Sequence, residues 1–235
     1  MRFDLGPTTA QVLAAFTDGV TACQGRVTDT ANDGRRLLAQ SVLPCLEEVR
    51  PGDRLQAGVA IRAIGGEVWV HPYLFRLVCS NGAIIARTLR TQHLADLGTL
   101  DPVDAVQAVR EAVEACCEPD VFVETLDQVR TVQDATADLM VTQLPIMSLL
   151  SRLSVGGNEH LLAGIMDQFF REGDRSQFGL ANAITATARE LRDPDLRWEL
   201  EELGGAIAVG ALTPSPSQGP PATAQRNRAV LAGSV

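Results

Sequence analysis

An alternating stretch, residues 55–75, narrows most sharply what this chain can fold into. In its first half, LQAGVAIRAI, every second residue is apolar and Arg62 falls on the opposite face, which is the pattern of a half-buried strand. The pair Gly65-Gly66 suits a two-residue hairpin turn, since glycine accepts the positive φ angles that such turns need. The second half, EVWVHPYLF, returns as the partner strand, with Pro72 marking a bulge or a strand end. An antiparallel hairpin is therefore expected.

The segment that follows, residues 76–93, is compatible with two structures. In the first, Asn81-Gly82 forms a two-residue turn between two strands. In the second, a strand ends near Cys79, and Ser80 or Asn81 caps a helix that continues past residue 90. The helical spacing of the apolar residues after this cap favours the second structure.

Most of the remaining chain is predicted to be helical. Thr8 or Thr9 can cap the first helix, and Asp101 followed by Pro102 is typical of a helix start. Helices are expected over residues 8–20, 34–49 (interrupted at Pro44), 101–117, 119 to a break at Pro145, 159–173, 176–192 and 193–208. A small antiparallel sheet in the N-terminal half, packed with helices and followed by a helical C-terminal half, makes the expected fold class α+β.

The composition is that of one globular domain with a tail. Hydrophobic residues make up 46% and charged residues 21%, which separates this chain from disordered proteins. We expect a single α+β domain over residues 1–211, with the sheet at about 53–95 and the helical region at about 101–211. Residues 212–235 are rich in proline and serine, so a flexible tail is expected there. Neither a membrane span nor a signal peptide is recognisable, so the expected location is the cytoplasm.

The basic residues and the cysteines exclude several chemistries. All 20 basic residues are arginine, so a P-loop lysine and Schiff-base catalysis are excluded. The five cysteines are odd in number and form no CxxC pair, so a disulfide framework is not expected and most should be small buried hydrophobes.

The charges are distributed unevenly along a chain of net charge −9. The sheet region is locally basic, whereas residues 96–205 are strongly acidic. Arginines on a sheet, with Trp69 and Tyr73 close by, suit single-stranded nucleic acid through phosphate pairing and base stacking. The candidate nucleic-acid-binding residues are Arg54, Arg62, Arg76, Arg87 and Arg90.

The spacing of the residues supports a catalytic or metal site less well than it supports a nucleic-acid-binding surface. Cys79 with His93 offers a thiol–imidazole pair, but a strand followed by a helix would separate them by roughly 17 Å. Adjacent Cys116 and Cys117 chelate one tetrahedral ion poorly. Two acidic clusters could hold magnesium for a nuclease, but such clusters are more typical of a solvated helix face. The clusters are Asp167, Glu172 and Asp174, and Glu199, Glu201 and Glu202. We therefore predict no catalytic residue, no metal and no cofactor.

Two separated motifs resemble a phage- and plasmid-borne family catalogued as domain of unknown function nine hundred and thirty-two. The first motif comprises Arg76, Leu77, Val78, Cys79, Asn81, Gly82 and His93. The second is GLANAIT, with Asn182, Ala183 and Thr185, followed by Leu203-Gly204-Gly205. The resemblance spans residues of about 50 to 210 and leaves the N-terminal region and the long acidic helices unmatched. It implies a mobile-element context and structural roles for Cys79, Asn81, Gly82, His93, Asn182 and Thr185, but no established activity.

The leading hypothesis is a non-enzymatic module of a phage or plasmid type that contacts single-stranded nucleic acid through the arginine-bearing sheet. Formation of a homo-oligomer would strengthen a weak basic patch by linking several copies. One alternative is an interaction module whose acidic helices bind a basic partner. The other is a hydrolase that uses the cysteine or the carboxylates.

Overall fold

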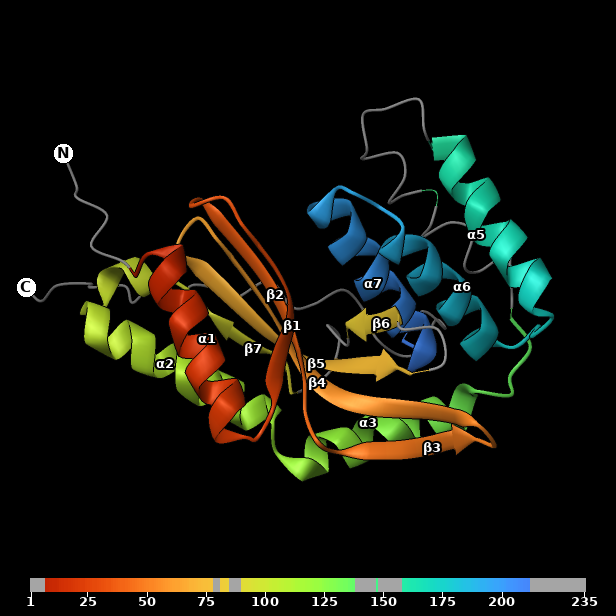
Figure 1. The fold of residues 1–235 in the computed structure, drawn as a ribbon, viewed down its shortest axis with the longest axis horizontal. Helices are drawn as coiled ribbons and strands as arrows, with labels where there is room; N and C mark the ends of the chain where they lie inside the picture. Colours follow the sequence, from red (N-terminus) through yellow and green to blue (C-terminus); the bar gives the residue numbers. More distant parts are fainter. Residues whose placement is uncertain (1–6, 78–80, 85–89, 138–146, 148–157, 212–235) are drawn as a thin grey trace, which may run out of the picture.

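The computed structural model confirms the α+β class, with an antiparallel sheet in the N-terminal half and helices mostly in the C-terminal half (Figure 1). The structure describes residues 7–77, 81–84, 90–137, 147 and 158–211.

The first helix, α1 (Thr9–Ala22), forms where the sequence predicts it. Thr8 is its N-cap and accepts a hydrogen bond from the backbone N–H of Gln11. The Gln11 side chain in turn accepts from the backbone N–H of Thr8, so two of the otherwise unpaired donors at the helix start are satisfied.

The helix predicted over residues 34–49 is wrong. The chain instead forms β1 (Arg26–Asn32), β2 (Arg36–Val42) and β3 (Leu46–Arg50). Leu37 to Val42 are all buried, so both faces of β2 are covered. A strand covered on both faces loses the alternation of apolar and polar residues, and a short apolar run is then indistinguishable from a helix.

The predicted hairpin is confirmed and forms the centre of the sheet. β4 (Asp53–Ile64) pairs with β5 (Glu67–Arg76) along its length, and the turn residues Gly65 and Gly66 have φ angles of +62° and +88°. Pro72 neither ends nor interrupts β5. It lies between the two segments of β5 that pair with different neighbouring strands, so no described strand needs a donor at that position.

Residues 81–84 and 92–94 are strands, so the helix favoured there is wrong. β6 (Asn81–Ile84) and β7 (Gln92–Leu94) both pair antiparallel with β5, and residues 85–89 lie outside the described part of the chain. The strand order is β1-β2-β4-β5-β6, with β3 also paired to β4 and β7 to β5. Both segments complete the free edge of β5, and this tertiary pairing overrides local helix propensity.

The C-terminal half is helical. Its helices begin and end close to the predicted positions, except that α3 ends well before Pro145. The elements are a short 3₁₀ helix η1 (Leu97–Thr99), α2 (Pro102–Cys116), α3 (Pro119–Val132), α5 (Asn158–Glu172), α6 (Gln177–Arg189) and α7 (Pro194–Ala208).

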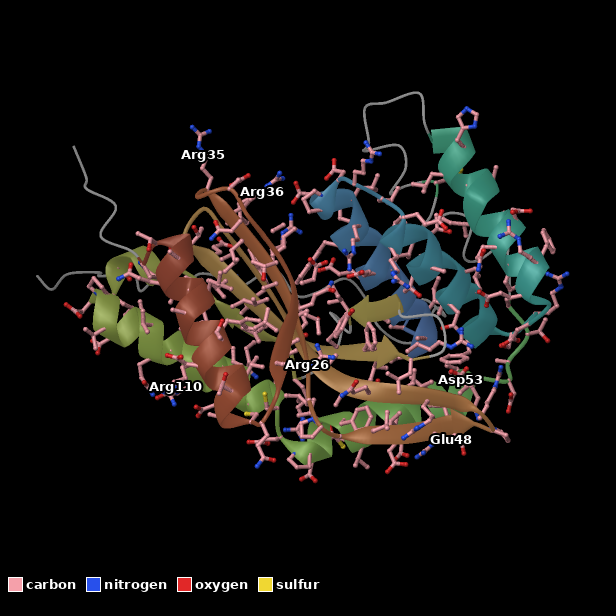
Figure 2. All side chains as sticks on the ribbon, in the orientation of Figure 1. Arg26, Arg35, Arg36, Glu48, Asp53 and Arg110 are labelled. Atoms are coloured by element: carbon pink, nitrogen blue, oxygen red, sulfur yellow. The ribbon has the colours of Figure 1, made fainter. Side chains whose placement is uncertain are left out.

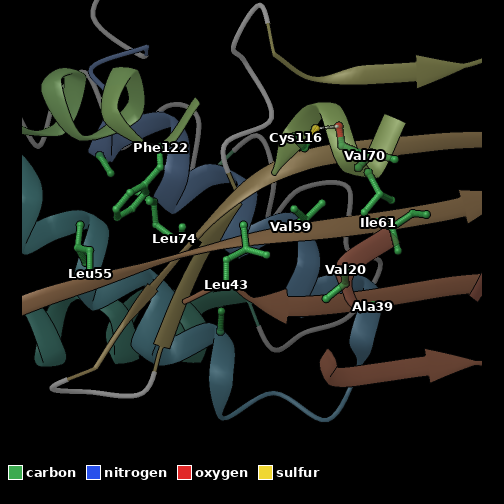
Figure 3. Packing of buried hydrophobic residues seen from close by; sticks show 14 of the residues in the cluster. Val20, Ala39, Leu43, Leu55, Val59, Ile61, Val70, Leu74, Cys116 and Phe122 are labelled. Atoms are coloured by element: carbon green, nitrogen blue, oxygen red, sulfur yellow. Dashed lines mark hydrogen bonds between the residues drawn. The ribbon is translucent and has the colours of Figure 1, made fainter. Parts of the chain in front are cut away.

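The helices cover the sheet from two sides (Figure 1). α1 and α2 lie together on one side, and α6 and α7 lie beside β6 on the other, with α5 outermost. The main core contains the apolar face of β4, where Val59 and Ile61 are fully buried against the neighbouring strand and helices (Figure 3). A smaller cluster lies on the opposite face of the sheet and contains Leu38, Ala60, Tyr73, Ile84 and Trp198.

In the described part of the chain, no helix is long and apolar enough to cross a membrane.

Replacing Gly58 in β4 tests how tightly the centre of the sheet is packed. A Cβ at this position would lie 2.1 Å from the Ser41 carbonyl oxygen and 2.8 Å from Tyr73 Cδ1. Because the backbone oxygen cannot move aside, we expect Gly58→Ala to lower the free energy of unfolding by about 2–3 kcal/mol in urea titrations. The control is Gly164→Ala in α5, where the new Cβ has only one neighbour, at 3.9 Å. Unchanged stability of Gly58→Ala would contradict the close packing.

Candidate nucleic-acid interface

The four predicted arginines that the structure describes do not form one surface. Arg54 is exposed at the start of β4, where the register places it opposite Glu48. Arg62 is half-buried on the same strand and face, eight residues and therefore about 26 Å further on. Arg87 lies outside the described residues.

Two of these arginines are held by carboxylates. Arg76 pairs with Leu55 in the register, which places it on the opposite face of the sheet from Arg62. Its guanidinium donates to both Asp53 carboxylate oxygens, each at 2.8 Å. Arg90 donates to Glu124 on α3 at 2.6 Å. The four described arginines therefore do not present their guanidinium groups on one exposed face.

Other arginines are equally dispersed (Figure 2). Arg35 projects from the tip of the β1–β2 hairpin, whereas Arg110 lies on α2 and pairs with Glu114 at 3.0 Å. Arg50 is surrounded by Asp174, Asp134 and Ser176. Arg50 and Arg110 are thus paired with nearby carboxylates, as Arg76 and Arg90 are.

Arg62, Trp69 and His93 lie in one row across three strands. The register pairs Arg62 on β4 with Trp69 on β5, and Trp69 with His93 on β7. The rings of Trp69 and His93 stack, with centroids 5.0 Å apart and planes inclined by 6°. The His93 side chain is 46% exposed, and its Nε2 lies 3.3 Å from the Glu67 carboxylate. This row combines a cation with two parallel aromatic rings.

Arg62 differs from Arg76 and Arg90, which pair with Asp53 and Glu124. Among the described residues, no carboxylate forms an ion pair with Arg62. Its neighbour in the row on the other side is Leu38 of β2, which also lines a cavity. This cavity, of about 230 Å³, lies between β1, β2 and the start of α7, and Gln40, Arg197 and Trp198 form part of its wall.

A buried polar cluster holds α7 against the sheet beside this cavity. The Glu201 carboxylate, 1% exposed, accepts hydrogen bonds from Arg197 Nε at 3.0 Å and from the Gln40 amide. The Gln40 carbonyl accepts from the Tyr73 hydroxyl at 3.1 Å, and Arg197 also donates to Asp29. Burial raises the pKa of Glu201 to about 7, although Arg197 and Gln40 oppose the rise. Both Glu201 oxygens thus accept hydrogen bonds within the cluster.

His71 lies two residues from Trp69 on the same face of β5 and stays neutral. It is 4% exposed, and its Nδ1 is 3.3 Å from the Thr91 hydroxyl. Burial and, to a smaller extent, the positive charge of Arg62 lower the pKa of His71 to about 4. The adjacent Trp198 indole donates to Glu202 at 2.7 Å. His71 therefore contributes no charge to the interface at neutral pH.

Of the family-motif residues that the structure describes, Gly82, Asn182 and Thr185 are buried, whereas Leu77 and His93 are exposed. Gly82 on β6 packs on Tyr73, since a Cβ there would lie 1.7 Å from the Tyr73 hydroxyl oxygen. Asn182 and Thr185 are buried in α6, and the Thr185 hydroxyl donates to the carbonyls of Ala181 and Asn182. Asn81 begins β6, and Cys79 lies outside the described residues.

In the described part of the chain, the residues named for a catalytic site do not come together. Asp167 pairs with Arg171, Asp174 pairs with Arg50, and Glu172 lies 4.0 Å from Arg76. No three His, Cys, Asp or Glu residues among those described are arranged to hold a metal ion.

Comparison with known proteins finds no matching family model, no similar curated protein and no similar solved structure. The resemblance to a phage and plasmid family stays a prediction.

Replacing His71 tests whether it is held neutral by burial. Its pKa in the folded protein lies below the ordinary value, so stability present above pH 6.5 is lost as the pH falls toward 4. The stability difference between wild type and His71→Gln should shrink by about 2 kcal/mol between pH 7.5 and pH 5. Urea unfolding at the two pH values measures this difference. His160→Gln, at an exposed position on α5, is the control, and an equal difference at both pH values would contradict the account.

Proposed function

We propose that the chain is a non-enzymatic module that binds single-stranded nucleic acid on the row formed by Arg62, Trp69 and His93. The stacked arrangement of Trp69 on His93, beside an arginine with no described carboxylate partner, is the observation that supports this proposal. The pairing of an aromatic surface with a cation matches the chemistry of a base and its phosphate.

Each residue of the row has a distinct role in the proposal. The Trp69–His93 pair offers the π surface on which a base stacks, a contact of about 1–3 kcal/mol per base. Arg62, across the strand from Trp69, pairs with the adjoining phosphate. None of these contacts reads a base edge, so we expect little sequence preference.

The overall charge of the protein limits the affinity. With a net charge of −9, the protein repels a polyanion over most of its surface, and the single half-buried Arg62 releases few counterions. Binding by one copy should accordingly be weak and confined to the row. A homo-oligomer would raise the affinity by linking several rows on one strand.

The row also provides its own spectroscopic probe. The chain has two tryptophans, of which Trp198 is 2% exposed and enclosed between α7 and the sheet, while Trp69 is half-buried on the row. A base that stacks on Trp69 should quench the fluorescence of Trp69. This is the part of the tryptophan emission that iodide in solution can also quench. Quenching on addition of oligothymidylate is therefore expected in wild type and absent in Trp69→Phe.

The binding test compares arginines on the same strand. Fluorescence polarisation of a labelled oligothymidylate at low salt should show binding by wild type that weakens as salt is raised. Trp69→Ala should weaken binding by about tenfold, which corresponds to the loss of one stacked base. Arg62→Ala should weaken binding and reduce the salt dependence, whereas Arg54→Ala, about 26 Å away on β4, should leave both unchanged. Absence of binding at low salt, or equal losses for the two arginine variants, would contradict the proposal.

A further inference from the structure

The close approach of α1 and α2 brings two cysteines together. The helices lie side by side on one side of the sheet (Figure 1), and a Cβ on Gly19 of α1 would lie 2.9 Å from Val113 Cγ1 of α2. Helices approach this closely only where one residue has no side chain. Gly19 and Val113 thus mark the crossing point of the pair.

Cys23 and Cys117 lie one helical turn beyond this crossing point. Each is the C-cap of its helix, and its backbone N–H bonds to the carbonyl of Gly19 (3.2 Å) or of Val113 (3.1 Å). Residues four positions apart lie on the same helix face, so the two side chains continue the contact of Gly19 with Val113. Cys23 is close enough to Cys117 to contribute to the raised pKa of the Cys117 thiol.

The pair is also accessible. Both cysteines are free and half-buried, and both line a cavity of about 220 Å³ between the helix ends and β4. The neighbouring Cys116 is buried, and its thiol donates to the Arg90 carbonyl at 3.4 Å. Cys45 is exposed and lines the same cavity.

We propose that Cys23 and Cys117 form a thiol pair that is converted to an intramolecular disulfide by low-molecular-weight disulfides of the glutathione type. The Cys23 thiolate attacks the small disulfide, forms a mixed disulfide and releases one thiolate. Cys117 then loses its proton to that released base and attacks the Cys23 sulfur, releasing the second small thiol. Two protein thiols are oxidised and one small disulfide is reduced to two thiols, so two electrons are transferred.

The surroundings of Cys117 determine the order of these steps. Burial and the neighbouring Cys23 raise the pKa of Cys117, so little thiolate is present there and Cys23 starts the exchange. A thiol of high pKa is also a poor leaving group, which slows reduction of the disulfide once it has formed. The bond would join the ends of α1 and α2 and close a loop containing all strands from β1 to β7.

The decisive experiment oxidises the full chain in glutathione buffers under anaerobic conditions. Intact mass spectrometry of wild type should show a loss of about 2 Da, and non-reducing peptide mapping should recover a Cys23–Cys117 linkage. Because the closed loop is long, Tm should rise by about 10 °C on oxidation. The rise and the linkage should be absent in Cys23→Ser and Cys117→Ser, and retained in the matched control Cys45→Ser.

A second pair of variants tests the geometry directly. Gly19→Ala should separate the helices at their crossing point and slow formation of the disulfide, and adding Val113→Ala should restore the rate. Gly164→Ala, with open space around the new Cβ, serves as the control for a helical glycine. Peptide maps that show other linkages, a persistent mixed disulfide or only free thiols in wild type would overturn the proposal, and none of these outcomes bears on nucleic-acid binding.

Discussion

The pairing of β4 with β5 across Gly65 and Gly66 is the constraint on which the rest of the structure depends. Two consecutive positive φ angles close the hairpin with two turn residues, so Ile64 must face Glu67 and every later pair is fixed. The same register places Val59 and Ile61 in the main core and Arg62 beside Trp69 on the other face. A shift by one residue would exchange these two sets, burying a guanidinium and exposing valine and isoleucine.

The two faces of the sheet differ in polarity and in how far helices cover them. One face is apolar and packs against α1, α2 and the neighbouring helices. The other is apolar only near Ala60 and Tyr73, where α7 covers it, and the cluster of Gln40, Arg197 and Glu201 fills that contact with hydrogen bonds. Beyond the reach of α7, the row of Arg62, Trp69 and His93 continues the same face. A ligand that carries both an aromatic ring and negative charge would fit on the uncovered part of this face, next to the polar pairs under α7.

Much of this fold could be predicted from the sequence, and particular residues explain the rest. Hairpin pairing counted outward from Gly65-Gly66 gives the Arg62–Trp69 pair directly, so two of the three residues of the proposed row can be predicted from the sequence. His93 cannot, because residues 92–94 form a strand only by pairing with β5, a tertiary contact that local spacing does not encode. The same holds for β2, whose two covered faces erase its alternation. Likewise, the ion pairs of Arg76 with Asp53 and of Arg90 with Glu124 cannot be derived from a charge count.

The most direct test of the central claim is a titration of isotope-labelled protein with oligothymidylate, followed by two-dimensional NMR. The account predicts that the first signals to shift are the Arg62 and His93 amides and the Trp69 indole N–H, while those of α2 and α3 stay in place. Shifts confined to the acidic helices, or none at concentrations where polarisation reports binding, would contradict the claim that this row is the binding surface.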